Sequence, residues 1–211
     1  MNSIFPKSKI AFILCIMSFV LYFGCGSDPE EGEVVVPAES IGKGWEEYSA
    51  GNYGAAILAF ESALSESADP TPTASEEADA YNGLGWVYLD FSQSVFVNQK
   101  NIATSMGKFQ EALVRDADHA DAHVGKAALL LIRRTSQDDF RDALKAIDSA
   151  LQGKAEYLYR HDYDSQADLY ALKAQCYYYL GEQNKAREEV ARVLAVEKNN
   201  SAALAMQMLM R

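Results

Sequence analysis

The chain has 211 residues, of which 49% are hydrophobic and 11% aromatic. This content excludes intrinsic disorder over most of the length and allows one domain or two. The formal net charge is -11 at pH 7, and without residues 1–24, which hold Lys7 and Lys9 and no acid, 17 basic residues face 30 acidic ones. Such acidity disfavours nucleic acids and anionic lipid headgroups as partners, and it also promotes solubility.

The first 24 residues have the pattern of a secretory signal. Residues 1–9 carry two lysines and no acid, and residues 10–23 are apolar or aromatic except for Ser18. A charged start followed by a short apolar stretch is typical of such signals, whereas a membrane-spanning helix needs about 20 apolar residues. We predict a lipoprotein signal peptide over residues 1–24, with an ordinary signal peptide or an uncleaved anchor as the alternatives.

The end of this segment reads LYFGC, from Leu21 to Cys25, and resembles a bacterial lipobox. The resemblance implies that Cys25 is lipidated and becomes the new N-terminus. Each buried methylene of an acyl chain contributes about 0.8 kcal/mol to membrane anchoring. Residues 25–40 are rich in Gly, Pro and acid and have no helical period, so we predict a flexible acidic tether there.

Residues 41–198 carry one helix pair four times. The first copy contains GWEEYSAGNYGAAILAFESAL and the last contains KAQCYYYLGEQNKAREEVARVL. Each second helix has a stripe with steps of four and three residues, large in the centre and mostly small at its ends. A single pair cannot bury such a stripe, but stacked pairs can. The four stripes are Ala56, Phe60 and Ala63; Ser105, Phe109 and Ala112; Ala143, Ile147 and Ala150; and Ala186, Val190 and Val193.

This arrangement resembles the tetratricopeptide repeat, a 34-residue helix–turn–helix unit. The resemblance covers about residues 40–198 and implies an all-α solenoid of about four helical hairpins. Successive first helices start 41, 42 and 47 residues apart. We therefore expect insertions in the loops at residues 69–73, 92–100 and 152–164.

Helix-capping patterns agree with this layout. Thr73 with Glu76 and Ser165 with Asp168 have the spacing of a capping box. Residues 199–201, Asn-Asn-Ser, open a last helix, and we expect residues 199–211 to cap the C-terminal end of the stack. A partner surface made by its methionines is the alternative. These are Met206, Met208 and Met210.

In the tetratricopeptide family the first helices line a concave groove that holds a segment of a partner protein. The equivalent positions here include both tryptophans and several tyrosines, which are side chains that dominate binding hot spots. Packing against neighbouring repeats is the alternative. The family's Lys and Asn clamp for a carboxylate is not expected, because Asp90 and Asp121 hold such places. The predicted lining consists of Ile41, Trp45, Tyr48, Asn82, Trp86, Leu89, Val124, Ala128, Leu131, Gln175, Tyr178 and Tyr179.

Residues 116–123, DADHADAH, look like a metal site, since imidazole and carboxylate suit transition metals. A metal-binding or catalytic module at His119 and His123 is therefore one alternative function. An EF-hand is excluded, because no Gly lies at the turn and no Glu closes a twelve-residue loop. We favour a repeat junction with Ala117 in the family's usual Pro position, and predict no metal.

Cys176 is the one cysteine within the predicted repeats, so no disulfide is expected there. It lies among aromatic residues, and we expect it to pack as a small buried apolar group. No Gly-rich phosphate loop and no nucleophile elbow is present. We therefore predict no enzyme, no cofactor and no small-molecule substrate.

These features predict a non-enzymatic adaptor that binds another envelope protein through the groove. We expect it to be lipid-anchored in the outer membrane and to face the periplasm, because Gly26 after the cysteine resembles an outer-membrane sorting signal. The acids at Asp28, Glu30 and Glu31 resemble a surface-export signal instead. A structural homo-oligomer, held by residues 95–97 and the terminal methionines, is the remaining alternative.

Overall fold

The computed structural model of the chain describes residues 35–93, 99–157, 163 and 165–211. Within these ranges lie nine α-helices, one 3₁₀ turn and no strand. None of these helices is long and apolar enough to cross a membrane. The predicted signal peptide, Cys25 and residues 95–97 lie outside the described residues.

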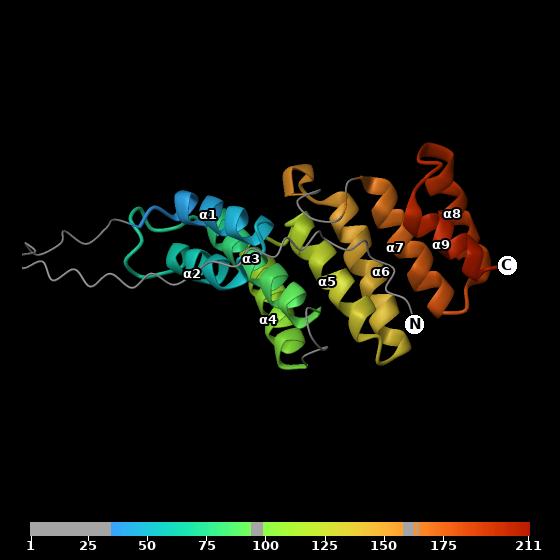
Figure 1. The fold of residues 1–211 in the computed structure, drawn as a ribbon, viewed down its shortest axis with the longest axis horizontal. Helices are drawn as coiled ribbons and strands as arrows, with labels where there is room; N and C mark the ends of the chain where they lie inside the picture. The colour runs from blue at the N-terminus through green and yellow to red at the C-terminus, as the bar shows by residue number, and fades with distance from the viewer. Residues whose placement is uncertain (1–34, 94–98, 158–162, 164) are drawn as a thin grey trace, which may run out of the picture. The chain divides into compact units, whose positions relative to one another are not determined.

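The helices pair in chain order into four hairpins, α1–α2, α3–α4, α5–α6 and α7–α8, and each hairpin packs against the next (Figure 1). The last helix, α9, packs against both α7 and α8. This confirms the expected all-α stack of four hairpins with a further helix. The helices are α1 (Pro37–Ser49), α2 (Tyr53–Ala63), α3 (Ala74–Gln93), α4 (Gln99–Arg115), α5 (Ala120–Arg133), α6 (Gln137–Gln152), α7 (Gln166–Tyr179), α8 (Gln183–Val196) and α9 (Ser201–Leu209), with the 3₁₀ turn η1 (Ala155–Tyr157) between α6 and α7.

The first helix begins earlier than expected. We predicted a tether as far as residue 40, but α1 begins at Pro37. Proline suits a first helical position, because an N–H there has no partner within the helix. The chain just before it is also held, since the Asp69 amide donates to the Val35 carbonyl at 2.9 Å. The last residues of the expected tether therefore belong to the first hairpin.

The four predicted stripes form the core between the helices. Every one of their residues is 3% exposed or less. The one polar member, Ser105, donates its hydroxyl to the Gly85 carbonyl at 2.7 Å, which avoids the cost of a buried hydroxyl without a partner. The stripe pattern read from the sequence is confirmed.

Two phenylalanines fill gaps that exist because both flanking helices carry glycine. The Phe60 ring lies between Gly44 of α1 and Gly83 of α3, and a Cβ at Gly83 would lie 2.3 Å from its Cζ. The Phe109 ring lies between Gly85 of α3 and Gly125 of α5, and a Cβ at Gly125 would lie 2.2 Å from its Cζ. Real Cβ atoms do not approach so closely, so each ring requires its glycines.

In the last two hairpins the central stripe residue is smaller than phenylalanine, and the residue that faces it is larger than glycine. In the third hairpin Ile147 is the central residue and Ala127 takes the place of glycine. In the fourth hairpin Val190 packs in one cluster with Ala174 of α7 and with Met206 of α9. A smaller central side chain thus accompanies a larger residue on the facing helix, which keeps the joint close-packed.

Both predicted capping boxes are present. The Thr73 amide donates to Glu76 Oε2 at 2.8 Å, and the Glu76 amide donates to Thr73 Oγ1 at 3.3 Å. Ser165 and Asp168 form the second box, at the start of α7. These side chains satisfy amides that have no partner within the helix, so the second and fourth repeats begin where the sequence indicates.

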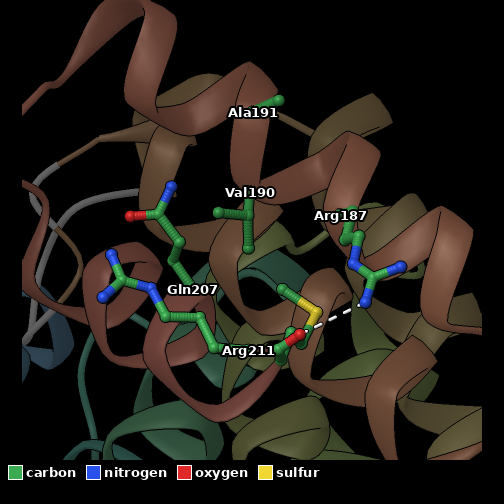
Figure 2. Close-up of a pocket in the computed structure, with 6 residues that line it drawn as sticks. Arg187, Val190, Ala191, Gln207 and Arg211 are labelled. Carbon is green, nitrogen blue, oxygen red and sulfur yellow. Dashed lines mark hydrogen bonds between the residues drawn. The ribbon is translucent and has the colours of Figure 1, made fainter.

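A cavity of about 310 Å³ lies between α8 and α9 (Figure 2). Its walls are Val190 and Ala191 of α8 and side chains from the end of α9. Two arginines stand at its rim. Arg187 donates to the Met210 carbonyl at 3.2 Å, and Arg211 lies on the α9 side.

The glycines provide a matched test of packing. A methyl group at Gly125 meets the Phe109 ring, whereas one at Gly107, inside α4, meets nothing within 4 Å. We expect Gly125→Ala to lower the free energy of unfolding by about 1–3 kcal/mol through over-packing. We expect Gly107→Ala to raise it by up to about 1 kcal/mol through helix propensity. Urea-induced unfolding followed by circular dichroism measures both changes.

The Phe109→Ile background isolates the cause. The smaller side chain leaves room for a methyl group, so Gly125→Ala is expected to cost less free energy there than in the wild type. Equal costs in the two backgrounds would contradict the steric explanation.

Candidate protein-binding face

The predicted groove residues lie on α1, α3, α5 and α7, and we call the side formed by these helices the first-helix face. Half of the predicted lining is core, because the first helices also pack directly on one another. The exposed fraction of these side chains is 9% or less, so a partner does not reach them. The prediction that these six residues line an accessible groove is therefore wrong. The six buried residues are Ile41, Asn82, Trp86, Leu89, Val124 and Ala128.

Polar contacts tie neighbouring first helices together. The buried Asn82 of α3 donates to Asp121 Oδ2 of α5 at 2.6 Å. On the preceding joint, the Tyr48 hydroxyl of α1 donates to Asp90 of α3. Both carboxylates are thus engaged within the stack. That the chain has no Lys and Asn clamp for the carboxylate of a partner stays a prediction.

Two described parts of the segment between the third and fourth hairpins contact earlier repeats. The Lys154 amide donates to the Asp118 carbonyl of the α4–α5 turn at 3.2 Å. The Tyr163 ring lies 6.2 Å from the Trp86 ring, which contacts Phe109 edge-on. Trp86 is therefore enclosed by its own chain and is 4% exposed.

One accessible part of the face lies at the first hairpin. The half-buried Trp45 packs edge-on against Tyr48, with ring centroids 5.7 Å apart. Tyr53, at the start of α2, lies 5.9 Å from Tyr48. Predicted lining residues thus meet at this end of the stack.

A second accessible part lies at the last two hairpins, and we call it the tyrosine cluster. It consists of Tyr178 and Tyr179 at the end of α7 and Phe140 at the start of α6. Tyr179 stacks on Phe140 with centroids 5.0 Å apart and planes 16° apart, and meets Tyr178 edge-on. Even so, Tyr179 is 41% exposed. The remaining predicted residues, Leu131 and Gln175, are half-buried.

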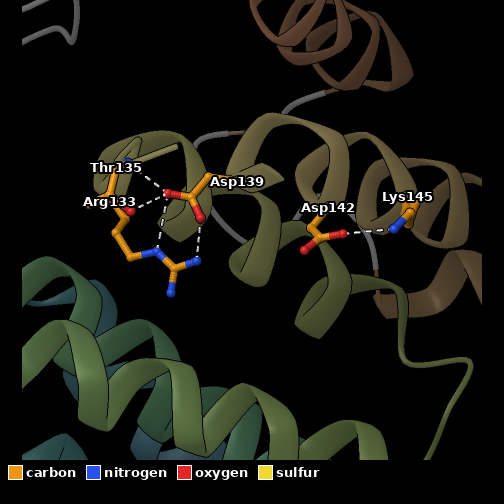
Figure 3. Close-up of polar contacts among 5 residues, drawn as sticks. All are labelled: Arg133, Thr135, Asp139, Asp142 and Lys145. Carbon is orange, nitrogen blue, oxygen red and sulfur yellow. Dashed lines mark hydrogen bonds and ion pairs between the residues drawn. The ribbon is translucent and has the colours of Figure 1, made fainter. Parts of the chain in front are cut away.

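A network of polar contacts at the α5–α6 turn holds the start of α6 in place (Figure 3). Phe140 is the residue that follows Asp139 in this helix. Asp139 accepts from the amide of Thr135 at 2.7 Å and from its hydroxyl at 2.9 Å. It also forms an ion pair with Arg133. The hydrogen bond from this guanidinium is the main reason that the pKa of Asp139 falls to about 2. No sequence motif predicts this network, because it joins the end of α5 to the start of α6.

The two histidines of the suspected metal stretch have structural roles at a repeat junction. His119 is fully buried and caps α5, its Nδ1 accepting from the Ala122 amide at 3.3 Å. His123 places Nε2 2.9 Å from the Ala117 carbonyl, and burial lowers its pKa. Among the described residues, no group of three or more His, Cys, Asp or Glu is arranged to hold a metal ion.

Cys176 is fully buried within α7, as expected. Burial raises the pKa of its thiol to about 12, so the thiol is protonated at neutral pH. A protonated, enclosed thiol is a poor nucleophile. That the chain is not an enzyme stays a prediction.

Two solved structures are similar to the described chain. A crystal structure of MamA protein is 19% identical, with a TM-score of 0.57 over 82% of this chain and 80% of that one. A structure of Pseudomonas aeruginosa PilF is 16% identical, with a TM-score of 0.61 over 82% of this chain and 66% of that one. No family model matches the sequence, and no curated protein matches it. The fold is a tetratricopeptide-type solenoid. At such identities the likeness extends to the fold alone.

The Asp139 network predicts a pH-dependent contribution to the stability of this solenoid. The folded pKa of about 2 lies below the ordinary aspartate pKa of 3.8, so the contribution is present above about pH 4 and is lost as the pH falls towards 2. We expect Asp139→Asn to lower the free energy of unfolding by about 1–2 kcal/mol at pH 7. The difference from wild type should shrink towards pH 3 in urea titrations.

Asp142→Asn is the control, because the Asp142–Lys145 pair in the same helix is exposed. Such pairs contribute less than about 1 kcal/mol. Equal losses for the two variants, or a loss at Asp139 that does not change with pH, would contradict the proposed role of the network.

The cover over Trp86 predicts a fluorescence change. In a Trp45→Phe background Trp86 is the only tryptophan. Tyr163→Ala is expected to shift its emission to longer wavelength, to increase quenching by acrylamide, and to cost about 1 kcal/mol of stability from the lost aromatic pair. Tyr179→Ala, a control without this contact, should leave the emission unchanged. An unshifted spectrum in Tyr163→Ala would show that the loop does not shield Trp86.

Proposed function

We propose that this chain is a lipid-anchored adaptor of the cell envelope that holds a segment of another envelope protein against the tyrosine cluster. The observation that carries the proposal is the exposure of the Tyr179 ring, which stacks on the buried Phe140 at the last two hairpins. Tyr179 remains 41% exposed although Phe140 and Tyr178 both contact it. Large rigid rings with a polar tip give much contact area for little loss of conformational freedom, so they favour protein binding.

The surroundings of the cluster support a rigid binding site rather than a mobile one. Phe140 follows Asp139, whose network with Arg133 and Thr135 fixes the first turn of α6. Tyr178 and Tyr179 lie in the last turn of α7. A site built on helices keeps its geometry before the partner arrives, which lowers the entropic cost of binding. An apolar or aromatic segment, extended or helical, suits such a surface.

The proposed anchor and location rest on the sequence. Lipidation of Cys25 would hold the solenoid at the outer membrane. The resemblance of Gly26 to a sorting signal favours the periplasmic side of that membrane. Residues 26–36 would separate the solenoid from the lipid. An adaptor rather than an enzyme is supported by the described histidines and the described thiol. His119 and His123 serve the junction, and Cys176 is enclosed.

In-cell photo-crosslinking tests the binding face. A photoreactive residue replaces Tyr179 in the full chain, expressed in its native host. The matched control replaces Leu58 of α2, which is 69% exposed and lies outside the first-helix face. We expect one discrete protein adduct at Tyr179, weakened about tenfold by Tyr178→Ala, and none at Leu58. Equal adduct patterns at the two positions would reject the tyrosine cluster as the site.

The same cells test the anchor. Cys25→Ser is expected to move the chain from the membrane to the soluble fraction and to remove the adduct at Tyr179. A variant that stays in the membrane fraction would contradict lipid anchoring through Cys25. A soluble variant that keeps the adduct would support the binding face and reject the need for the tether.

A further inference from the structure

The last helix repeats the register of the first helices. In the third repeat Gly125 and Ala127 follow the stripe residue Ala112 by thirteen and fifteen positions, and Met206 and Met208 follow Val193 by the same intervals. The core agrees with this register. Met206 packs in one cluster with Val190, as Gly125 packs against the Phe109 ring. Helix α9 is therefore arranged as the first helix of a fifth hairpin.

The face that a second helix covers in the other hairpins is open on α9. The equivalents of Met208 are Gly44, Gly85, Ala127 and Ala174, and all four are buried beneath their second helices. Met208 itself is 65% exposed. We call this face, formed by Leu204 and Met208, the open joint. Leu204 is 37% exposed.

This face is unlike that of a helix that ends a stack in water. A terminal helix of a repeat protein keeps a polar outer side for solubility. Helix α9 reads SAALAMQML and carries no charged residue. Contiguous exposed apolar side chains of this kind mark interaction sites.

The C-terminal residues carry a formal charge opposite in sign to that of the whole chain. Residues 183–211 hold five basic and three acidic side chains, a formal charge of +2, whereas the whole chain carries -11. Arg187 and Arg211 stand at the rim of the adjoining cavity (Figure 2). Among the described residues, neither guanidinium lies within 4.0 Å of a carboxylate oxygen. The rim therefore offers two cations to an acidic ligand.

We infer that the open joint docks an amphipathic helix of a partner protein, which takes the place of a second helix. The partner helix carries a small residue opposite Met208, because here the bulky side chain stands on α9 and not on its companion. It carries acidic side chains towards Arg187 and Arg211. A second copy of this chain does not meet these requirements, since the stripes of its second helices are buried in their own hairpins and its α9 has no acid.

A display library of helices tests this inference independently of the tyrosine cluster. Its parent is the sequence of α6, QDDFRDALKAIDSALQ, which has the small–large–small stripe of a second helix and four aspartates. Stripe and flanking positions are randomised, and binders are selected on the full chain. We expect selected peptides to hold Ala or Gly at the centre of the stripe and an excess of Asp and Glu on its flanks.

Variants at exposed positions show where the peptides bind. Met208→Asp is expected to weaken binding about tenfold or more, while Leu58→Asp, at a residue of similar exposure on α2, leaves it unchanged. Arg211→Glu should weaken binding at low salt and less so at high salt, because exposed charges are screened. Circular dichroism confirms that each variant is folded.

Three results would overturn the inference. In the first, no selected peptide loses affinity with Met208→Asp. In the second, the selected peptides have neutral or basic flanks. In the third, sedimentation of the full chain without peptide detects a dimer that Met208→Asp dissociates, which would assign the open joint to a second copy.

Discussion

Each hairpin joint depends on one bulky side chain of a second helix fitting between two first helices. Where that side chain is Phe60 or Phe109, both facing positions are glycine, and a single methyl group would overlap the ring. Where it is Ile147 or Val190, the first helix of the same hairpin carries alanine. The distance between first helices is therefore set by a volume shared among three helices, and a substitution on one of them is felt by the others.

This close approach decides which side chains a partner can reach. Because the first helices contact one another, positions equivalent to those that line a groove in tetratricopeptide proteins, such as Asn82 and Val124, lie in the core here. Tyr163 lies against Trp86 as well. Accessible aromatic side chains remain near the turns of the first, third and fourth hairpins, so they are concentrated at two separate places on the face.

Periodic features of the fold were predictable from the sequence, and contacts between distant segments were not. Stripes and capping boxes depend on residues three or four apart, so the stripe residues and the boxes at Thr73 and Ser165 were found. The burial of Trp86 depends on a loop residue 77 positions away, for which no local pattern exists. The Asp139 network and the exposure of Met208 likewise depend on which helices contact each other. The repeat pattern in the sequence does not predict those contacts.

Neighbouring first helices are joined by polar contacts that differ from joint to joint. A phenol meets a carboxylate between α1 and α3, and an amide meets a carboxylate between α3 and α5. If the second and third hairpins were exchanged, Asp121 would face α1 and lose the hydrogen bond from the Asn82 amide. Losing a hydrogen bond to a buried carboxylate is costly. The repeated stripe therefore gives each hairpin the same shape. The polar contacts, which differ from joint to joint, favour one order of the hairpins in the stack over the others.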